Sequence, residues 1–298
     1  MKRENKVDIH QAVTDAIIEA IESNPGEYRT PWHTLSGRGL PRNAVTKASY
    51  AGMNIISLAC SAFKHGFASN EWATYRQLQG AGLQVKRGEK GTLIVFYRAY
   101  EVDPSPDNPD DDGTRRVARH SHVFNLSQTE GWQPPAEDER PPPQTDALDR
   151  LIAATGADVR IGGDRAYYQT REDYIALPSP SLYRNADEAQ RAAEICSTGF
   201  HEFGHWTGAP SRLARDLSGR FGSSAYSIEE LVAETTAAFL CAEFNISALP
   251  RADHAQYLAH WLSVLKADNR AIFTAAARAS EATRYLMSFL TKEDARAA

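Results

Sequence analysis

The chain has 298 residues, of which 42% are hydrophobic and 24% charged, a composition typical of globular proteins. It contains no run of about 18 to 20 apolar residues, which excludes a membrane-spanning helix, and its first residues lack the apolar stretch of a secretion signal. Its cysteines (Cys60, Cys196 and Cys241) are too few and too scattered for a disulfide framework or a cysteine-based metal site. The sequence predicts a cytoplasmic protein with reduced thiols, and its length favours two domains.

Charge is distributed unevenly along the chain, whose formal net charge is -5. Residues 28–100 contain ten Lys or Arg and only two acids, Glu71 and Glu89, which gives a local charge of +8. The remainder must carry -13, because -5 minus 8 is -13. This asymmetry predicts a basic binding surface on the first domain.

The first domain is expected to span residues 1–133 and to be a small α+β unit. Apolar residues recur near a 3.6-residue spacing over residues 7–22, which predicts an amphipathic helix. Further helices are expected over residues 54–64 and 74–79, and strands over residues 93–97 and 122–124.

A proline-rich segment, residues 134–145, separates the two predicted domains. Five of the fifteen prolines lie here among acidic and polar residues. Proline removes backbone donors and favours extended chain, so we expect a semi-rigid linker. A second segment rich in proline and aspartate, residues 103–113, cannot bury an apolar face and predicts a loop within the first domain.

The second domain, residues 146–298, is predicted to be mainly helical with a short antiparallel sheet. Residues 166–169 and 174–177 favour a β-hairpin. Strand 174–177 is a candidate edge strand for pairing with an extended peptide, and the alternative is that it is plain sheet structure. Helices are expected over residues 145–153, 186–206, 228–244, 252–267 and 269–290, with Asn185 or Asp187 as a candidate N-cap of the long second one.

The most specific pattern of this domain is His201-Glu-Phe-Gly-His205, an HExxH motif within a predicted helix. The i, i+4 spacing places both imidazoles on one helical face, where they can share one metal ion. Glu202 lies beside that face and is the candidate general base toward a water activated by Zn²⁺ or a similar divalent ion such as Mn²⁺. The same pattern occurs by chance on solvated helices, but apolar residues before it indicate a buried helix.

The third ligand defines the class of site. A histidine ligand six residues after the second motif histidine is excluded, because Ser211 occupies that position. The remaining candidate for the third ligand is a carboxylate from the following helix. Glu230 is the expected ligand, and Glu229 in the same turn is the alternative. Glu234 is expected to orient a ligand histidine. Glutamates in a first helical turn are also favoured by the helix dipole alone.

Tyr226 precedes these glutamates and is a candidate hydrogen-bond donor to a developing oxyanion, although a packing role is equally compatible with its position.

In the basic segment, aromatic residues are interleaved with cations, as single-strand binding by stacking and phosphate contact requires. The alternative is a solvated basic face over an aromatic core. The candidate DNA-binding residues are Trp72, Tyr75, Arg76, Lys86, Arg87, Lys90 and Arg98.

Several short motifs occur in a fixed order over nearly the whole chain. They are Pro41–Ala44, Tyr50–Asn54, Arg87–Gly91, Val123–Asn125, Gln128–Gly131, Ala166–Tyr168, His201–Gly208, Pro210–Leu213 and Glu229–Glu234. By these motifs the chain resembles the ArdC-type plasmid antirestriction proteins.

The resemblance implies an N-terminal domain that binds single-stranded DNA and a C-terminal zincin-like metallopeptidase domain. It also implies protection of incoming plasmid DNA from host restriction during conjugation. A restriction subunit is then a candidate protein substrate, binding by stacking predicts little sequence specificity on DNA, and no membrane partner is expected. Two alternatives remain. One is a non-enzymatic protein that covers single strands or mimics DNA around a structural metal, and the other is a cytoplasmic peptidase unrelated to DNA.

Overall fold

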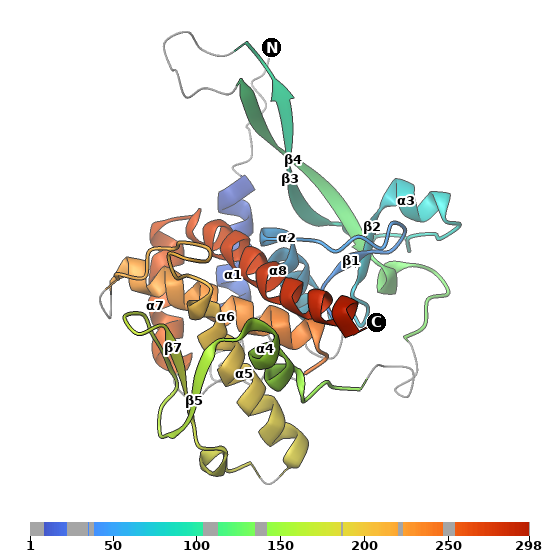
Figure 1. Cartoon of the computed structure of the whole chain (residues 1–298). Helices are drawn as coiled ribbons and strands as arrows, with labels where there is room; N and C mark the ends of the chain where they lie inside the picture. Colours follow the sequence, from blue (N-terminus) through green and yellow to red (C-terminus); the bar gives the residue numbers. More distant parts are fainter. Residues whose placement is uncertain are drawn as a thin grey trace.

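The computed structural model of the chain describes residues 9–22, 35, 39–103, 113–134, 142–185, 187–219, 223–246 and 254–297. The expected α+β fold is confirmed, because helices and two small sheets alternate along these residues (Figure 1). None of the helices in the described ranges is long and apolar enough to cross a membrane. All three cysteines are free and buried.

The first sheet is four-stranded, in the order β1-β2-β4-β3. Its strands are β1 (Arg42–Asn43), β2 (Glu71–Thr74), β3 (Thr92–Glu101) and β4 (Thr114–Asn125), and β1 and β2 were not predicted. The other elements of this half are α1 (Ile9–Glu22), α2 (Met53–His65), α3 (Tyr75–Gly80) and the 3-10 turn Leu126–Gln128. A capping box begins α3, in which the Thr74 hydroxyl accepts from the Gln77 backbone and the Gln77 side chain accepts from the Thr74 backbone.

Strands β3 and β4 form an antiparallel ribbon that projects beyond the rest of the sheet (Figure 1). Only residues 123–125 of β4 pair with β2, whereas β4 pairs with β3 from Thr114 to Val123. At the base of the ribbon, α2 lies along the edge of β3. The Asn54 amide donates to the Val95 carbonyl and accepts from the Val95 N–H, which satisfies the backbone of an edge strand.

The second half contains a three-stranded sheet in the order β5-β7-β6, formed by β5 (Asp158–Gly163), β6 (Tyr167–Gln169) and β7 (Tyr174–Pro178). The predicted hairpin is confirmed as β6 and β7, but β5 was not predicted. The expectation that strand 174–177 is a free edge was wrong. β7 is the central strand, hydrogen-bonded on one side to β5 and on the other to β6, so its backbone cannot pair with a peptide.

The helices of this half are α4 (Ala147–Thr155), α5 (Glu188–Trp206), α6 (Ser224–Glu243), α7 (His254–Ala267) and α8 (Ala271–Ala297). Asp187 is the N-cap of α5, since its side chain accepts from the Gln190 N–H at 3.0 Å. Ser223 caps α6 in the same way. Each predicted helix is present, with boundaries shifted by a few residues.

One hydrophobic core crosses the predicted boundary between the halves. It joins residues of α1 and α2, such as Ile17 and Ile56, to residues of the later helices, such as Val232, Phe239 and Ile272. The Gly52 N–H also donates to the Ser280 hydroxyl at 2.7 Å. Most of the predicted linker, residues 135–141, lies outside the described residues. The other buried clusters each lie within one half, so the two halves share one core and also have cores of their own.

Candidate metal centre

The centre lies where α5 and α6 pack against each other. Gly204, inside the HExxH motif, allows this close approach: a Cβ there would lie 2.8 Å from the Cα of Ala233 on α6. Such a distance is far below an ordinary carbon contact. The glycine therefore brings the histidine face of α5 within reach of the glutamates on α6.

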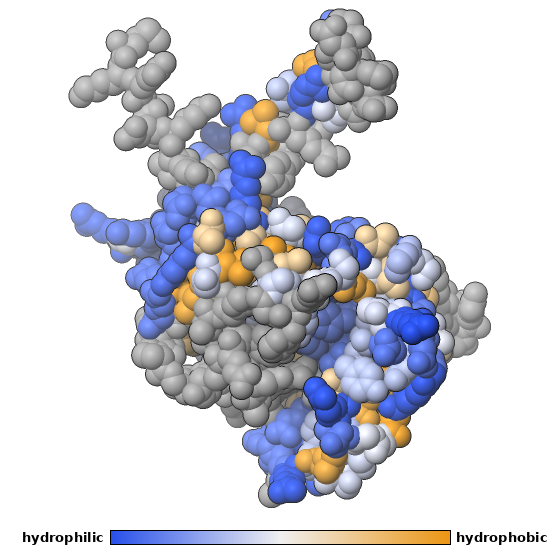
Figure 2. Space-filling view, turned by 90° about the vertical axis from the view of Figure 1, so that its left-hand side faces the viewer, coloured by the Kyte–Doolittle hydropathy of each residue, from blue (hydrophilic) through white to orange (hydrophobic). Residues whose placement is uncertain are grey.

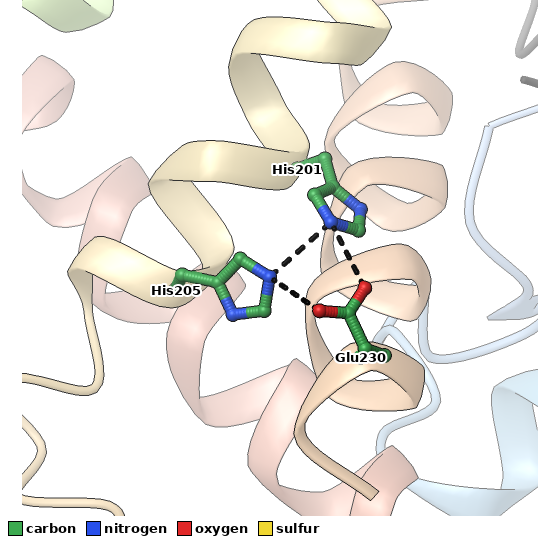
Figure 3. A group of neighbouring side chains, drawn as sticks. All are labelled: His201, His205 and Glu230. Atoms are coloured by element: carbon green, nitrogen blue, oxygen red, sulfur yellow. Dashed lines mark hydrogen bonds and ion pairs between the residues drawn. The ribbon is translucent and has the colours of Figure 1, made fainter. Parts of the chain in front are cut away.

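Three side chains converge between the two helices (Figure 3). The Nε2 atoms of His201 and His205 lie 3.2 Å apart, and each lies 3.5 Å from a carboxylate oxygen of Glu230. Ligand atoms on one tetrahedral ion are separated by about 3.3 to 3.6 Å when each is about 2.0 to 2.2 Å from the metal. The three distances and the donor types fit a divalent metal ion.

Each histidine directs its other ring nitrogen to a second glutamate. Nδ1 of His201 lies 3.5 Å from Glu234, and Nδ1 of His205 lies 3.3 Å from Glu229. A carboxylate at this position fixes the ring orientation and increases its basicity as a ligand. The structure thus places Glu230 between both Nε2 atoms and places its rival, Glu229, behind His205.

Glu229 is held there by Arg215, a residue that sequence reasoning did not single out. The Arg215 guanidinium donates to both Glu229 oxygens at 3.0 and 2.8 Å, to the Thr207 hydroxyl and to the Gly204 carbonyl. Both side chains of this pair are buried. The bidentate ion pair with Arg215 fixes the orientation of the Glu229 carboxylate, which then contacts the outer nitrogen of His205. This explains why Glu230 and not Glu229 faces the cluster centre.

The electrostatics follow from this packing. Burial lowers the pKa of His205, but its hydrogen bonds with Glu229 and Glu230 outweigh burial and raise the pKa to about 10. Burial raises the pKa of both glutamates, yet the neighbouring histidines, and Arg215 for Glu229, hold each pKa below its usual range. Two carboxylates and a proton-bearing histidine thus stabilise one another in the metal-free cluster.

The other candidate residues lie around this cluster. Glu202 is 3% exposed on α5, and its charge contributes to the raised pKa of His205. Tyr226 is half-buried on α6, one turn before Glu230 and on the same helical face.

A second arginine network fixes the small sheet beside α5. Arg212 lies over the Trp206 ring at 3.9 Å, donates to Asp173 and donates to the Tyr168 hydroxyl at 2.9 Å. The Tyr168 hydroxyl donates in turn to Asp173 at 2.7 Å. Burial and the hydrogen bond to Asp173 raise the pKa of Tyr168 to about 12. Arg212 lies within the Pro210–Leu213 motif of the sequence, whereas Arg215 lies just past that motif.

The candidate DNA-binding residues fall into three groups. Tyr75 and Arg76 are exposed at the start of α3, and Lys86, Arg87 and Lys90 are exposed in the turn before β3. Arg98 lies in β3, but its side chain is outside the described part of the structure.

Trp72 requires a correction. Its side chain is only 1% exposed and packs with Leu58, Ile94 and Val123 in the core between α2 and the sheet. The ring is therefore a structural part of β2 and is not available to stack on a base.

Comparison with known proteins agrees with both halves of this description. Residues 7–124 match the N-terminal domain of anti-restriction factor ArdC, and residues 146–278 match a zincin-like metallopeptidase domain. The chain is 40% identical over 281 residues to the uncharacterized protein y4eC of Sinorhizobium fredii, covering 92% of this chain and 90% of that protein. It is also 34% identical to a DNA primase TraC of Escherichia coli, but it spans only 28% of that protein's length.

Solved structures give the same result. The metal-free crystal structure of the antirestriction protein ArdC from plasmid R388 has a TM-score of 0.76 and 32% identity, with 96% of this chain and 98% of that chain covered. The Mn(II)-bound structure of the same protein has a TM-score of 0.74 and 34% identity, with 95% and 98% coverage. Together with the fold and the helix-borne cluster, these matches show that the chain belongs to the ArdC family of antirestriction proteins.

Proposed function

We propose that this protein binds single-stranded DNA through its N-terminal half and hydrolyses a peptide bond in a target protein at the α5–α6 centre. In the cell this combination would protect incoming plasmid DNA from the recipient's restriction system during conjugation. Membership of the ArdC family supports the antirestriction role. The basic segment over residues 28–100 supports a nucleic-acid partner.

The observation that carries the peptidase proposal is the combination of a convergent ligand triangle with an adjacent, non-ligating glutamate. His201, His205 and Glu230 would hold the ion, and Zn²⁺ suits this donor set, although Mn²⁺ is bound in the solved relative. When bound, a divalent ion supplies Lewis-acid polarisation of a carbonyl and lowers the pKa of water.

The protein's own residues would supply proton transfer and orientation. Glu202 would accept a proton from the attacking water and deliver it to the leaving amine. Tyr226, one turn before Glu230 on the same face of α6, would donate a hydrogen bond to the oxygen of the cleaved carbonyl. Glu234 and Glu229 would hold the two imidazoles in the ligating orientation.

The test separates metal binding from proton transfer. Purified wild type, His201→Ala and Glu202→Gln are compared for metal content and for protection of unmodified plasmid DNA during transfer into a restricting recipient. We expect about one metal per chain in wild type and in Glu202→Gln, and none in His201→Ala. We expect protection only in wild type, since a general base contributes about 10²- to 10⁴-fold to the rate.

Glu188→Gln, an exposed glutamate in the first turn of the same helix, is the matched control and should protect like wild type. If Glu202→Gln holds its metal and protects fully, proteolysis is not part of the function.

That outcome would favour a second candidate, a non-enzymatic protein with a structural metal. The observation in its favour is burial, because His201 is 6% exposed and Glu230 is 7% exposed. A structural ion between α5 and α6 would stabilise the fold and would not require Glu202. In that case His201→Ala would lower the melting temperature and reduce protection, while Glu202→Gln would change neither.

A further inference from the structure

Two faces of the projecting β3–β4 ribbon differ in what covers them. Side chains alternate between the faces of a strand, so Val123 and Arg119 of β4 lie on one face while Phe124, His122 and His120 lie on the other. The face of Val123 packs against α2 at its base. On the opposite face α3 packs beside Phe124, and His122 and His120 are exposed beyond it.

Two pairs of rings follow one another on this second face. The Tyr75 ring of α3 meets the Phe124 ring edge to face at 6.2 Å between centroids, and the His122 and His120 rings meet at 6.3 Å. Along β4 the three rings occupy every second position, a repeat of about 6.6 to 6.8 Å. Tyr75 is 44% exposed, and both histidines are exposed. We call Tyr75, Phe124, His122 and His120 the ring track.

Gly91 keeps the track uncovered at its centre. A Cβ at this position would lie 2.9 Å from the His122 Cβ and 3.2 Å from the Phe124 ring. Any larger residue here would therefore crowd the His122 Cβ and the Phe124 ring. The glycine leaves the space beside these two residues free of a side chain.

Cations border the track. Lys86, Arg87 and Lys90 are exposed in the turn that leads into β3, and the Lys86 ammonium reaches the Ser127 carbonyl just beyond the end of β4. Over residues 75–101 and 114–125 the sequence holds eight Lys or Arg and two acids. On the face shown in Figure 2, the described residues are mostly hydrophilic and the hydrophobic ones gather in small separate patches. A row of exposed rings beside positive charge is therefore suited to an anionic ligand with flat faces.

We infer that the ring track is the surface on which single-stranded DNA stacks its bases, with the cations of the 86–91 turn contacting its phosphates. This rests on the proposed function and assigns the DNA contact to one face of the sheet. Histidine, tyrosine and phenylalanine rings all stack on unpaired bases, and stacking tolerates any sequence. Duplex DNA offers no free base faces, so the track predicts a preference for single strands.

The test measures the affinity of the full-length protein for a fluorescent oligothymidine by anisotropy at fixed salt, with a duplex of equal length as competitor. The variants are Tyr75→Ala and the double variant His120→Ala/His122→Ala. The matched control is Phe96→Ala, because Phe96 is 46% exposed on the opposite face of the same ribbon. We expect about a five-fold or greater loss of affinity for each stacked base that is lost, and less than two-fold loss for Phe96→Ala.

The possible outcomes distinguish a failure of the ring track as the contact surface from a failure of DNA binding itself. Strong binding by wild type with unchanged affinity in the ring variants, or an equal loss in Phe96→Ala, would overturn the ring track while leaving DNA binding intact. Equal affinity for duplex and single strand would overturn stacking as the mode of contact. Absence of oligonucleotide binding by wild type would overturn both this inference and the DNA-binding half of the proposed function.

Discussion

The metal centre and the ring track differ in how their residues are held. In the metal centre every ligand contacts at least two other groups of the cluster, and between the two helices His201 and Glu230 are buried and His205 is partly buried. In the ring track two ring pairs, Tyr75–Phe124 and His120–His122, follow one another on one face of the sheet, and Tyr75 and both histidines are exposed. A buried network is ordered by the protein itself, whereas an exposed row of rings gains most of its order from the ligand that covers it. Substitutions should therefore affect stability in the first region and affinity in the second.

The largest effect on stability is expected from Arg215→Met. It removes the guanidinium that holds Glu229 and leaves a buried carboxylate without its main partner. Breaking a buried pair in this way costs about 3 to 5 kcal/mol. Urea denaturation of the metal-free protein would measure the change in the free energy of unfolding.

Arg212→Met is the control for Arg215→Met, because its partner Asp173 is 49% exposed and can be solvated. Its effect should be clearly smaller. The double variant Arg215→Met/Glu229→Gln should recover part of the lost stability, since it removes the uncompensated charge. An equal loss of unfolding free energy in the two arginine variants would show that the buried pair at the metal centre contributes no more to stability than the partly exposed Arg212–Asp173 pair.

The next largest effect should come from Gly204→Ala. The added methyl would lie 2.8 Å from the Ala233 Cα and must push α5 away from α6. Overpacking of this kind costs about 1 to 3 kcal/mol, and the displaced helix would separate the histidines from Glu230. The melting temperature, measured by thermal denaturation, and the metal affinity, measured by titration, should therefore both fall.

A fall in stability without loss of metal affinity would mean that the cluster tolerates helix separation. Gly80→Ala, at the end of α3 where no atom lies within 4 Å of the added Cβ, is the control and should change neither quantity.

Metal affinity should rise with pH. The pKa of His205 is raised above its usual value to about 10 in the metal-free protein, so its proton stabilises that state below about pH 6.5. This contribution is lost as pH rises through about 10. An ion must displace this proton at neutral pH, and affinity should increase about tenfold per pH unit between about pH 7 and 10.

Calorimetric titration in buffers of different ionisation enthalpy would count the protons released. About one proton per ion is expected at pH 7.5. No release would show that His205 is already neutral in the metal-free cluster.

The smallest effect is expected at the cations beside the ring track. Lys90→Ala removes one phosphate contact and should weaken oligonucleotide binding modestly. The slope of log affinity against log salt concentration should become shallower by about one unit. Binding curves at several salt concentrations would measure it. Lys47→Ala, whose ammonium is already paired with Glu71, should leave the salt slope unchanged. An equal change in both variants would argue against a localised DNA path.

The sequence predicted the arrangement of the histidine–glutamate cluster better than the exposure of the candidate DNA-binding residues, for a physical reason. A spacing of four residues on a helix fixes the relation of His201 to His205 wherever the helix packs. Exposure has no such local signature. Trp72 reads as an aromatic among cations, but β2 lies between β1 and β4 and buries its ring.

The choice between Glu229 and Glu230 was beyond the sequence for a related reason. Both residues lie in the same turn, and the orientation of that turn depends on Arg215, which lies in a segment between α5 and α6 without regular structure. Strand β5 escaped prediction because DVRIGG holds charge and glycine, and five of its six residues are exposed. Tertiary contacts decided both cases.

The core shared by the two halves has a consequence for expressing them apart. A polypeptide that began after the proline-rich segment would contain all the metal ligands, yet α7 and α8, whose buried residues in the shared core include Trp261, Leu265 and Ile272, would lose the cover of α1 and α2. Such a fragment would display a broad apolar surface and aggregate. We therefore expect that deletion at the apparent domain boundary would not separate the two proposed activities cleanly, and that point substitutions in the intact chain would test them better.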